Sequence, residues 1–139
     1  MSTFDKSFGM APTSDRLALR LGALFGLFAL VLGALAAHKG DKFLYDYLSK
    51  TNHLDIWRTA VFYQWIHALA LLAVGQGRPA RRGTVICWLI GVVLFSGSLY
   101  VLALDSTQKW AGPITPLGGL ILLVGWGWLW ISLLKKQSS

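Results

Sequence analysis

The stretch that decides the fold is Thr84–Leu104, TVICWLIGVVLFSGSLYVLAL, which holds 21 residues and no charge. Three more segments share this character: 17–37, charged only at Arg20, and the uncharged 59–77 and 111–134. A helix of about 20 residues, at about 1.5 Å each, crosses a hydrocarbon core of roughly 30 Å. Lipid offers the backbone no water, which favours helices, and the runs are too long for barrel strands. The sequence therefore predicts an all-α, membrane-embedded bundle of four transmembrane helices.

The composition agrees with a membrane protein and bounds the chemistry. Of the 139 residues, 55% are hydrophobic and 14% are charged, whereas soluble domains carry about 25% charged residues. All six acidic residues are aspartates, and the single cysteine, Cys87, permits no internal disulfide. The length fits one domain. We expect that domain at 17–134, a mobile N-terminal tail at 1–16 and a C-terminal tail at 135–139.

The longest connection between the predicted spans, residues 39–56, has a pattern typical of a short interfacial helix. Phe43, Leu44, Tyr47 and Leu48 follow the spacing i, i+1, i+4, i+5, which places them on one helical face. Such a face can lie on the membrane with its apolar side among the headgroups. We therefore expect a short helix in this first outer loop.

The basic residues predict an orientation. The formal charge is +7, but Lys and Arg lie between the apolar runs instead of forming a continuous face, which argues against nucleic acid as a partner. Four spans put both termini on one side, and that side carries eight Lys and Arg against five on the other. The turn Arg78–Arg82 is the strongest signal, because short loops follow the positive-inside rule best. We expect both termini in the cytoplasm.

The first span has a second interpretation and a small-residue face. Arg16 and Arg20 ahead of an apolar run, followed by 34–36 (ALA), also resemble a cleaved signal peptide, although the run exceeds the usual length of about 7–15 residues. Gly22 and Gly26 are four residues apart, a spacing that lets another helix approach closely. Glycine is also simply common in membrane helices, which is the alternative explanation. We expect a spanning helix with a close contact at both glycines.

Polar side chains inside two spans form the candidate site. Such residues are costly in a bilayer and need partners or a function. The second span contains Tyr63, Gln64 and His67, and the third contains Ser96 and Ser98. In an antiparallel hairpin they lie within about 3 Å of one depth, so we expect Gln64 and His67 to bond Ser96 or Ser98. Hydrogen bonding between helices is one interpretation. A ligand or proton site is the other, since histidine titrates near neutrality.

A second candidate cluster lies on the expected outer side. It consists of His38, after the first span, and Thr115, within the start of the fourth span at 112–119 (GPITPLGG). Prolines are tolerated at a helix start, although the same segment could expose backbone groups to a ligand. His38, His53 and His67 differ in depth and lack metal-ligand spacing, which makes haem on His38 and His67 a remote alternative. No carboxylate lies at the depth of His67 to build a catalytic dyad. We expect no enzyme, no cofactor and no metal.

Four stretches occur in the order found in one family of small membrane proteins: GALAAH at 33–38, WRTAVFYQWIHALA at 57–70, LFSGSLY at 94–100 and PITPLGG at 113–119. Over about residues 17–134 the chain resembles family of unknown function 423, the transmembrane protein 256-like family. It departs at Arg58, where many relatives carry an acidic or polar residue, and at Ala36, where many carry glycine. The resemblance implies a bacterial inner-membrane protein without an established reaction, and it argues against signal cleavage.

Two functional hypotheses follow. The first is a non-enzymatic integral membrane protein that binds lipid, a partner membrane protein or copies of itself. The second is a small oligomeric transporter or channel that uses the polar cluster around Gln64 and His67. Four short helices leave little room for a pore within one chain, and we find neither an intramembrane acid nor an internal repeat of the transporter type. The first hypothesis is therefore favoured.

Overall fold

The computed structural model describes residues 13–37, 43–76 and 82–136. Within these ranges the chain is all-α, as the sequence predicts. It forms five helices, α1 (Thr13–Leu35), α2 (Leu44–Lys50), α3 (Leu54–Gln76), α4 (Arg82–Leu104) and α5 (Ala111–Lys136). Helix α2 is the short helix expected in the 39–56 loop. The N-terminal tail before residue 13, His38 and positions 78–81 of the arginine turn lie outside the described residues.

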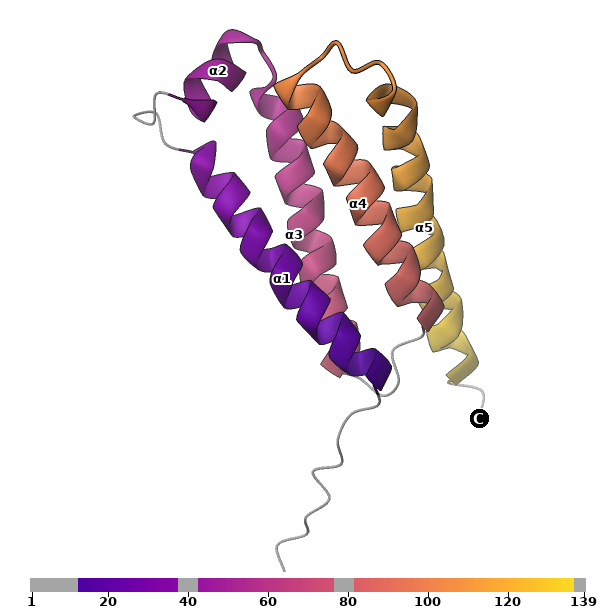
Figure 1. Ribbon diagram of the computed structural model, residues 1–139. Coiled ribbons are helices and arrows are strands. Elements are labelled where there is room, and N and C mark those ends of the chain that lie inside the picture. Colours follow the sequence, from indigo (N-terminus) through magenta and orange to yellow (C-terminus); the bar gives the residue numbers. More distant parts are fainter. Residues whose placement is uncertain (1–12, 38–42, 77–81, 137–139) are drawn as a thin grey trace, which may run out of the picture.

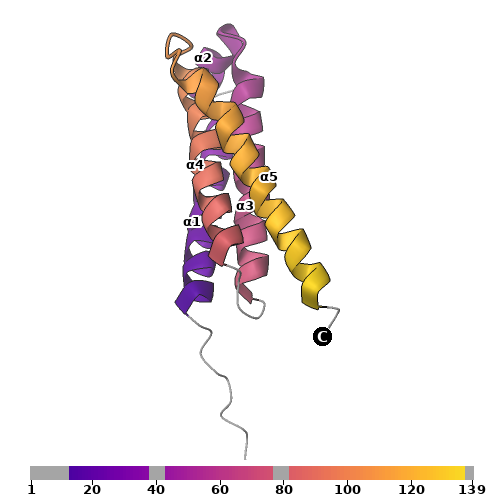
Figure 2. The same ribbon diagram turned by 90° about the vertical axis from the view of Figure 1, so that its right-hand side faces the viewer.

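The four long helices form a row in which each packs against the preceding long helix, and the α1–α3 and α4–α5 contacts are the most extensive (Figure 1). Helix α3 packs between α1 and α4, and α4 packs between α3 and α5. The start of α1 and the end of α5 lie at the same end of the bundle, and α2 lies at the opposite end (Figure 1). Figure 2 shows α5 inclined to its neighbours, with its C-terminal half leaning toward the side of α3.

Three helical stretches are long and apolar enough to cross a membrane, namely Arg16–Leu35, Arg82–Leu104 and Ala111–Leu134. They match three of the four expected spans. Helix α3 is as long as α1 and α4, with 23 residues each, but polar side chains such as Gln64 and His67 lower its mean hydropathy. The ends differ as well: α1 begins at Thr13 and α5 ends at Lys136. Residues 13–16 and 135–136, expected in the tails, are therefore helical.

Hydrogen bonds join helix α2 and His53, in the turn after it, to the end of α4. The Tyr47 hydroxyl donates to the carbonyl oxygen of Leu104 (2.6 Å), and Nδ1 of His53 bonds the carbonyl oxygen of Ala103 (3.1 Å). Leu48 is fully buried in a cluster that joins α2 to α1, α3 and α4. Helix α2 therefore covers one end of the bundle.

Glycines set the distances between neighbouring helices. A Cβ at Gly22 of α1 would lie 3.0 Å from the carbonyl oxygen of Ala68 on α3, whereas one at Gly26 would meet ordinary contacts at 3.8 Å. The close contact expected at both glycines is thus confirmed at Gly22 only. Between α4 and α5 the approach is tighter, because a Cβ at Gly118 would collide with the backbone of Phe95.

Candidate functional site

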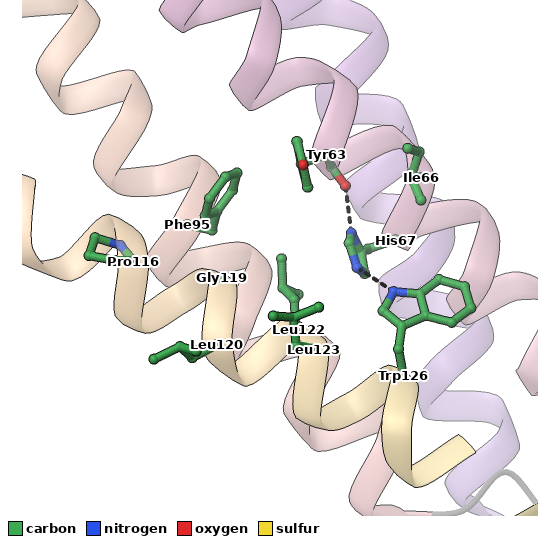
Figure 3. A pocket seen from close by; sticks show the side chains of 10 residues that line it. All are labelled: Tyr63, Ile66, His67, Phe95, Pro116, Gly119, Leu120, Leu122, Leu123 and Trp126. Atoms are coloured by element: carbon green, nitrogen blue, oxygen red, sulfur yellow. Dashed lines mark hydrogen bonds between the residues drawn. The ribbon is translucent and has the colours of Figure 1, made fainter. Parts of the chain in front are cut away.

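His67 lies buried on α3, with 3% of its surface exposed, and both ring nitrogens are engaged (Figure 3). Nδ1 lies 2.8 Å from the carbonyl oxygen of Tyr63, and Nε2 lies 3.0 Å from the indole nitrogen of Trp126 on α5. A carbonyl oxygen only accepts and an indole N–H only donates. The ring is therefore the neutral tautomer with its hydrogen on Nδ1. Neither nitrogen retains a free lone pair for a metal or haem iron.

Gln64, one turn earlier on α3, links three helices. Its Nε2 donates to the carbonyl oxygen of Phe25 on α1 (2.9 Å), and its Oε1 accepts from the Tyr100 hydroxyl of α4 (2.8 Å). The Tyr100 ring also packs edge-on against Trp57, with centroids 4.7 Å apart. The amide thus has a donor bond and an acceptor bond inside the protein, which removes the main cost of a polar group at this depth.

The expected bonds from Gln64 and His67 to the two serines are wrong. The Ser96 hydroxyl is buried and finds no partner among the described residues, and Ser98 instead bonds the carbonyl oxygen of Phe95 and the hydroxyl of Thr115. The rise per residue along a helix predicts which residues lie at the same level, but it gives neither the rotation of the helix about its axis nor the reach of a side chain. Tyr100 lies one turn beyond Ser96 on the same face, and its longer side chain reaches the amide.

Thr115 therefore belongs with Ser98 at the α4–α5 contact, where the two oxygens lie 2.7 Å apart. The carbonyl oxygen of Ala111, at 3.1 Å, is a second acceptor within reach of the Thr115 hydroxyl, and when the single hydrogen of Thr115 points there, Ser98 donates in the hydroxyl pair. His38, its expected neighbour, lies outside the described residues. The structure thus places Thr115 beside a member of the first candidate cluster.

Two residues that bond the cluster, Tyr100 and Trp126, were missed by sequence reasoning. The sequence did offer one signal, because a buried Trp or Tyr usually directs its polar atom to a partner. What the sequence lacked was the inclination of α5, which brings Trp126 to His67. The indole of Trp88 completes this aromatic group, with its centroid 4.7 Å from that of Trp126 and 6.0 Å from that of His67.

A groove of about 650 Å³ opens beside His67, between α3 and α5 (Figure 3). Helix α3 contributes Tyr63, Ile66 and His67 to its wall. The other lining residues come from α4 and α5, and they are Phe95, Pro116, Gly119, Leu120, Leu122, Leu123 and Trp126. None of these described lining residues is charged. Among the described lining side chains, those of His67, Trp126 and Tyr63 carry polar atoms; the first two bond each other, and the Tyr63 hydroxyl bonds no described residue.

The apolar exterior supports a membrane environment for this fold. Large apolar side chains are exposed along α1 and α5, among them Leu27 at 59% and Trp130 at 65%, while polar Gln64 and His67 are buried. In water such a surface is a liability for association, whereas in lipid it is the expected exterior. The fold and its site thus define a helical membrane protein with an interior polar cluster.

The chain belongs to the family described as protein of unknown function (DUF423), whose model matches residues 32–119. The resemblance noted from its motifs is thereby confirmed. The chain is 40% identical over 119 residues to a UPF0382 membrane protein of Staphylococcus saprophyticus, covering 83% of this chain and 94% of the relative. It is 38% identical over 112 residues to the UPF0382 membrane protein YwdK of Bacillus subtilis, covering 76% and 86%.

A eukaryotic relative widens the range of the family. A UPF0382 membrane protein of Schizosaccharomyces pombe is 36% identical over 114 residues, which covers 76% of this chain and 92% of the relative. No solved structure matches the fold. The comparisons therefore establish a membrane protein family, and the activity has to be argued from the site.

Proposed function

We propose that this chain is a non-enzymatic, four-span membrane protein that holds an acyl chain of a membrane lipid in the groove between α3 and α5. The observation that carries the proposal is the groove itself, about 650 Å³ in volume, with uncharged and mostly apolar walls among the described residues. Cavities of roughly 300–1,000 Å³ with such walls are the usual form of small-molecule sites. Uncharged walls favour a hydrocarbon chain over a phosphate or an ammonium group.

The fourth span is α3. Its 23 residues correspond to about 34 Å of helix, and it stands between α1 and α4, two helices that are apolar enough to cross (Figure 1). Its polar groups Gln64 and His67 are buried and hydrogen-bonded within the protein. A helix whose polar atoms are satisfied internally can stand in lipid.

The proposed location is a bacterial inner membrane with both termini in the cytoplasm. The support is the excess of Lys and Arg on the side of the termini. In addition, the start of α1 and the end of α5 lie at the same end of the bundle (Figure 1). A reporter enzyme that works only outside the membrane, fused after Ser139, is expected to be silent. Strong reporter activity would reverse the orientation.

Native mass spectrometry from mild detergent tests the groove occupant. The wild-type protein is expected to retain lipid, and Gly119→Leu is expected to retain less, because the new side chain enters the groove and its Cβ meets only the Phe95 ring, at 3.5 Å. The matched control is Gly127→Leu on the same helix, whose Cβ meets nothing within 4 Å. Equal lipid retention in both variants, or a bound protein in place of lipid, would overturn the proposal.

The alternative is a small oligomeric transporter or channel that uses Gln64 and His67. Both side chains are engaged within a single chain, which favours a structural role for them over a transport role. The discriminating measurement is proton or ion flux in liposomes carrying wild type or His67→Asn. Flux that depends on His67 would favour the transporter, and the absence of flux in both would favour the lipid-binding protein.

A further inference from the structure

A second cavity lies on a different face of α3, at the end of the bundle near α2. It has a volume of about 330 Å³ and is formed between the last turns of α1 and the N-terminal half of α3. Its lining on α3 includes Arg58, Val61, Phe62 and Trp65, which follow the spacing i, i+3, i+4, i+7 of one helical face. The groove residues of α3 lie on another stripe, so the two cavities are separate sites.

Small residues at the end of α1 and in the turn after it leave this cleft open. Gly33, Ala36 and Ala37 line it opposite α3, and a Cβ at Gly33 would already lie 3.3 Å from a methyl group of Val61. The indole of Trp57 donates to the carbonyl oxygen of Leu32 (3.0 Å) and fixes α1 to α3 at the cleft. The opening is therefore a feature of the packing between two fastened helices.

Arg58 is the cationic residue among those lining this cleft. Its side chain is 61% exposed, and its guanidinium nitrogen lies 3.7 Å from Asp55, whose side chain is 93% exposed. That ion pair is long and solvated, so it contributes little and leaves most of the guanidinium donors free. Arginine binds phosphate oxygens with two parallel donors. An acceptor of that geometry fits the mouth of the cleft.

We propose that this cleft binds an anionic membrane phospholipid, with its phosphate on Arg58 and one acyl chain between α1 and α3. From Arg58 to Trp65 the cleft follows α3 for about 10 Å, and apart from Arg58 its described lining is apolar or aromatic. A soluble phosphate would satisfy the arginine but leave this apolar wall uncovered. Basic pockets between membrane helices recognise anionic headgroups in this manner.

The proposal relies on α3 spanning the membrane as proposed above, and its test is independent of the groove. In mild detergent, native mass spectrometry measures binding of phosphatidylglycerol and of phosphatidylcholine with identical acyl chains. Wild type is expected to prefer phosphatidylglycerol by about threefold to tenfold, the range of one charge-assisted contact. Arg58→Gln is expected to abolish the preference, and Asp55→Asn to increase it by removing the competing carboxylate.

Two further variants separate the cleft from unspecific attraction. Ala37→Leu adds bulk at an exposed lining position and is expected to weaken both lipids. Arg82→Gln is the matched control, because Arg82 is an exposed arginine at the opposite end of the bundle. This variant is expected to keep the preference. A preference that survives in Arg58→Gln, or that Arg82→Gln removes equally, would overturn the phosphate site. Unchanged binding in Ala37→Leu would overturn the acyl-chain site.

Because Gly119→Leu alters only the groove, it is expected to leave the phosphatidylglycerol preference unchanged. Failure of the groove and failure of the cleft are therefore distinguishable. Circular dichroism of Arg58→Gln checks that the helices persist, which is expected for so exposed a side chain. Arg58→Lys provides a graded variant, expected to retain part of the preference because it keeps the charge and loses the paired donors.

Discussion

The contact between α1 and α3 and the contact between α4 and α5 both depend on glycine, yet different forces hold them. On the α1–α3 side, Trp57 and Gln64 donate into backbone carbonyl oxygens of α1, at 3.0 and 2.9 Å. On the α4–α5 side, Gly118 lies directly against the α4 backbone, and the hydroxyl pair of Ser98 and Thr115 is the side-chain hydrogen bond that crosses between the described parts of these helices. Hydrogen bonds join the first pair, and close packing joins the second.

This difference shows how one apolar composition can produce two kinds of helix contact. Lipid tails are as apolar as leucine, so membrane helices associate through close packing and through bonds between polar groups. Helices α1 and α3 approach closely at Gly22, but a methyl group fits at Gly26, and the side chains of Gln64 and Trp57 reach α1 elsewhere along the contact. At Gly118 no such space remains. The two contacts should therefore respond differently to small changes in volume and in polarity.

The largest effect is expected from Gly118→Ala, which breaks the close-packed contact. The new methyl group would collide with the backbone of Phe95 and force α4 and α5 apart, lowering the free energy of unfolding by about 1–3 kcal/mol. Thermal unfolding in mild detergent, followed by circular dichroism, measures this change. Gly26→Ala and Gly127→Ala are the controls and should be neutral or stabilising by up to about 1 kcal/mol, because alanine favours helix over glycine. Equal behaviour of all three variants would remove the distinction.

A smaller loss is expected from Gln64→Met, which breaks the hydrogen-bonded contact while preserving volume. Both bonds of the amide disappear and the Tyr100 hydroxyl loses its acceptor, so the cost should be about 1–2 kcal/mol. In a double-mutant cycle, Tyr100→Phe should cost less in the Gln64→Met background than alone, with a coupling of about 0.6–1.7 kcal/mol. Additive effects would mean that the two side chains do not share a bond.

Ser96→Ala sharpens the comparison by testing a polar group that has no described partner. Its hydroxyl is buried and unpaired among the described residues, so its removal should leave stability unchanged within about 0.5 kcal/mol or raise it slightly. Its effect should add to that of His67→Ala within about 0.5 kcal/mol. A larger coupling between the two substitutions would indicate that Ser96 and His67 share a hydrogen bond, contrary to this account.

The smallest effect is expected from Asp105→Asn in the loop after α4, and it depends on pH. Hydrogen bonds from the Thr107 side chain, the Gln108 side chain and the Thr107 amide lower the pKa of this exposed carboxyl. A lowered folded pKa stabilises the protein above the ordinary aspartate pKa, and this contribution disappears as pH falls through the folded value. The melting temperatures of wild type and variant should therefore differ at pH 6 and converge as pH falls below the folded pKa of Asp105. A constant difference would contradict this account.

Much of the fold could be predicted because hydropathy and length report directly on membrane helices. The stretch 84–104 contains no charge, and helix α4 follows it closely. The short helix α2 was visible in the spacing of Phe43, Leu44, Tyr47 and Leu48. Helix α3 is the ambiguous element, since the polar residues that mark its site also lower its hydropathy. Its spanning the membrane is a proposal that rests on its place in the row.

The partners within the site could not be predicted for a geometric reason. The sequence placed Gln64 and His67 near one depth in the membrane, but a bond also depends on helix rotation and on the tilt of a neighbour. Trp126 lies 59 residues after His67, and only the inclination of α5 brings its indole to the ring. The sequence shows a glycine at position 118, but only the packed arrangement of α4 and α5 shows that it lies against the backbone of Phe95.

The row of helices also dictates an order of events during synthesis. Each long helix packs against the long helix made just before it, so a newly inserted segment meets a neighbour without waiting for a distant part of the chain. Assembly of this kind relies on contacts that are short in sequence, which favours rapid folding. The α3–α5 groove is the exception, because its second wall, α5, is made only after α4. The described lining of the cleft at Arg58 is complete once α3 has been inserted, whereas the groove forms only after α5 has joined the bundle.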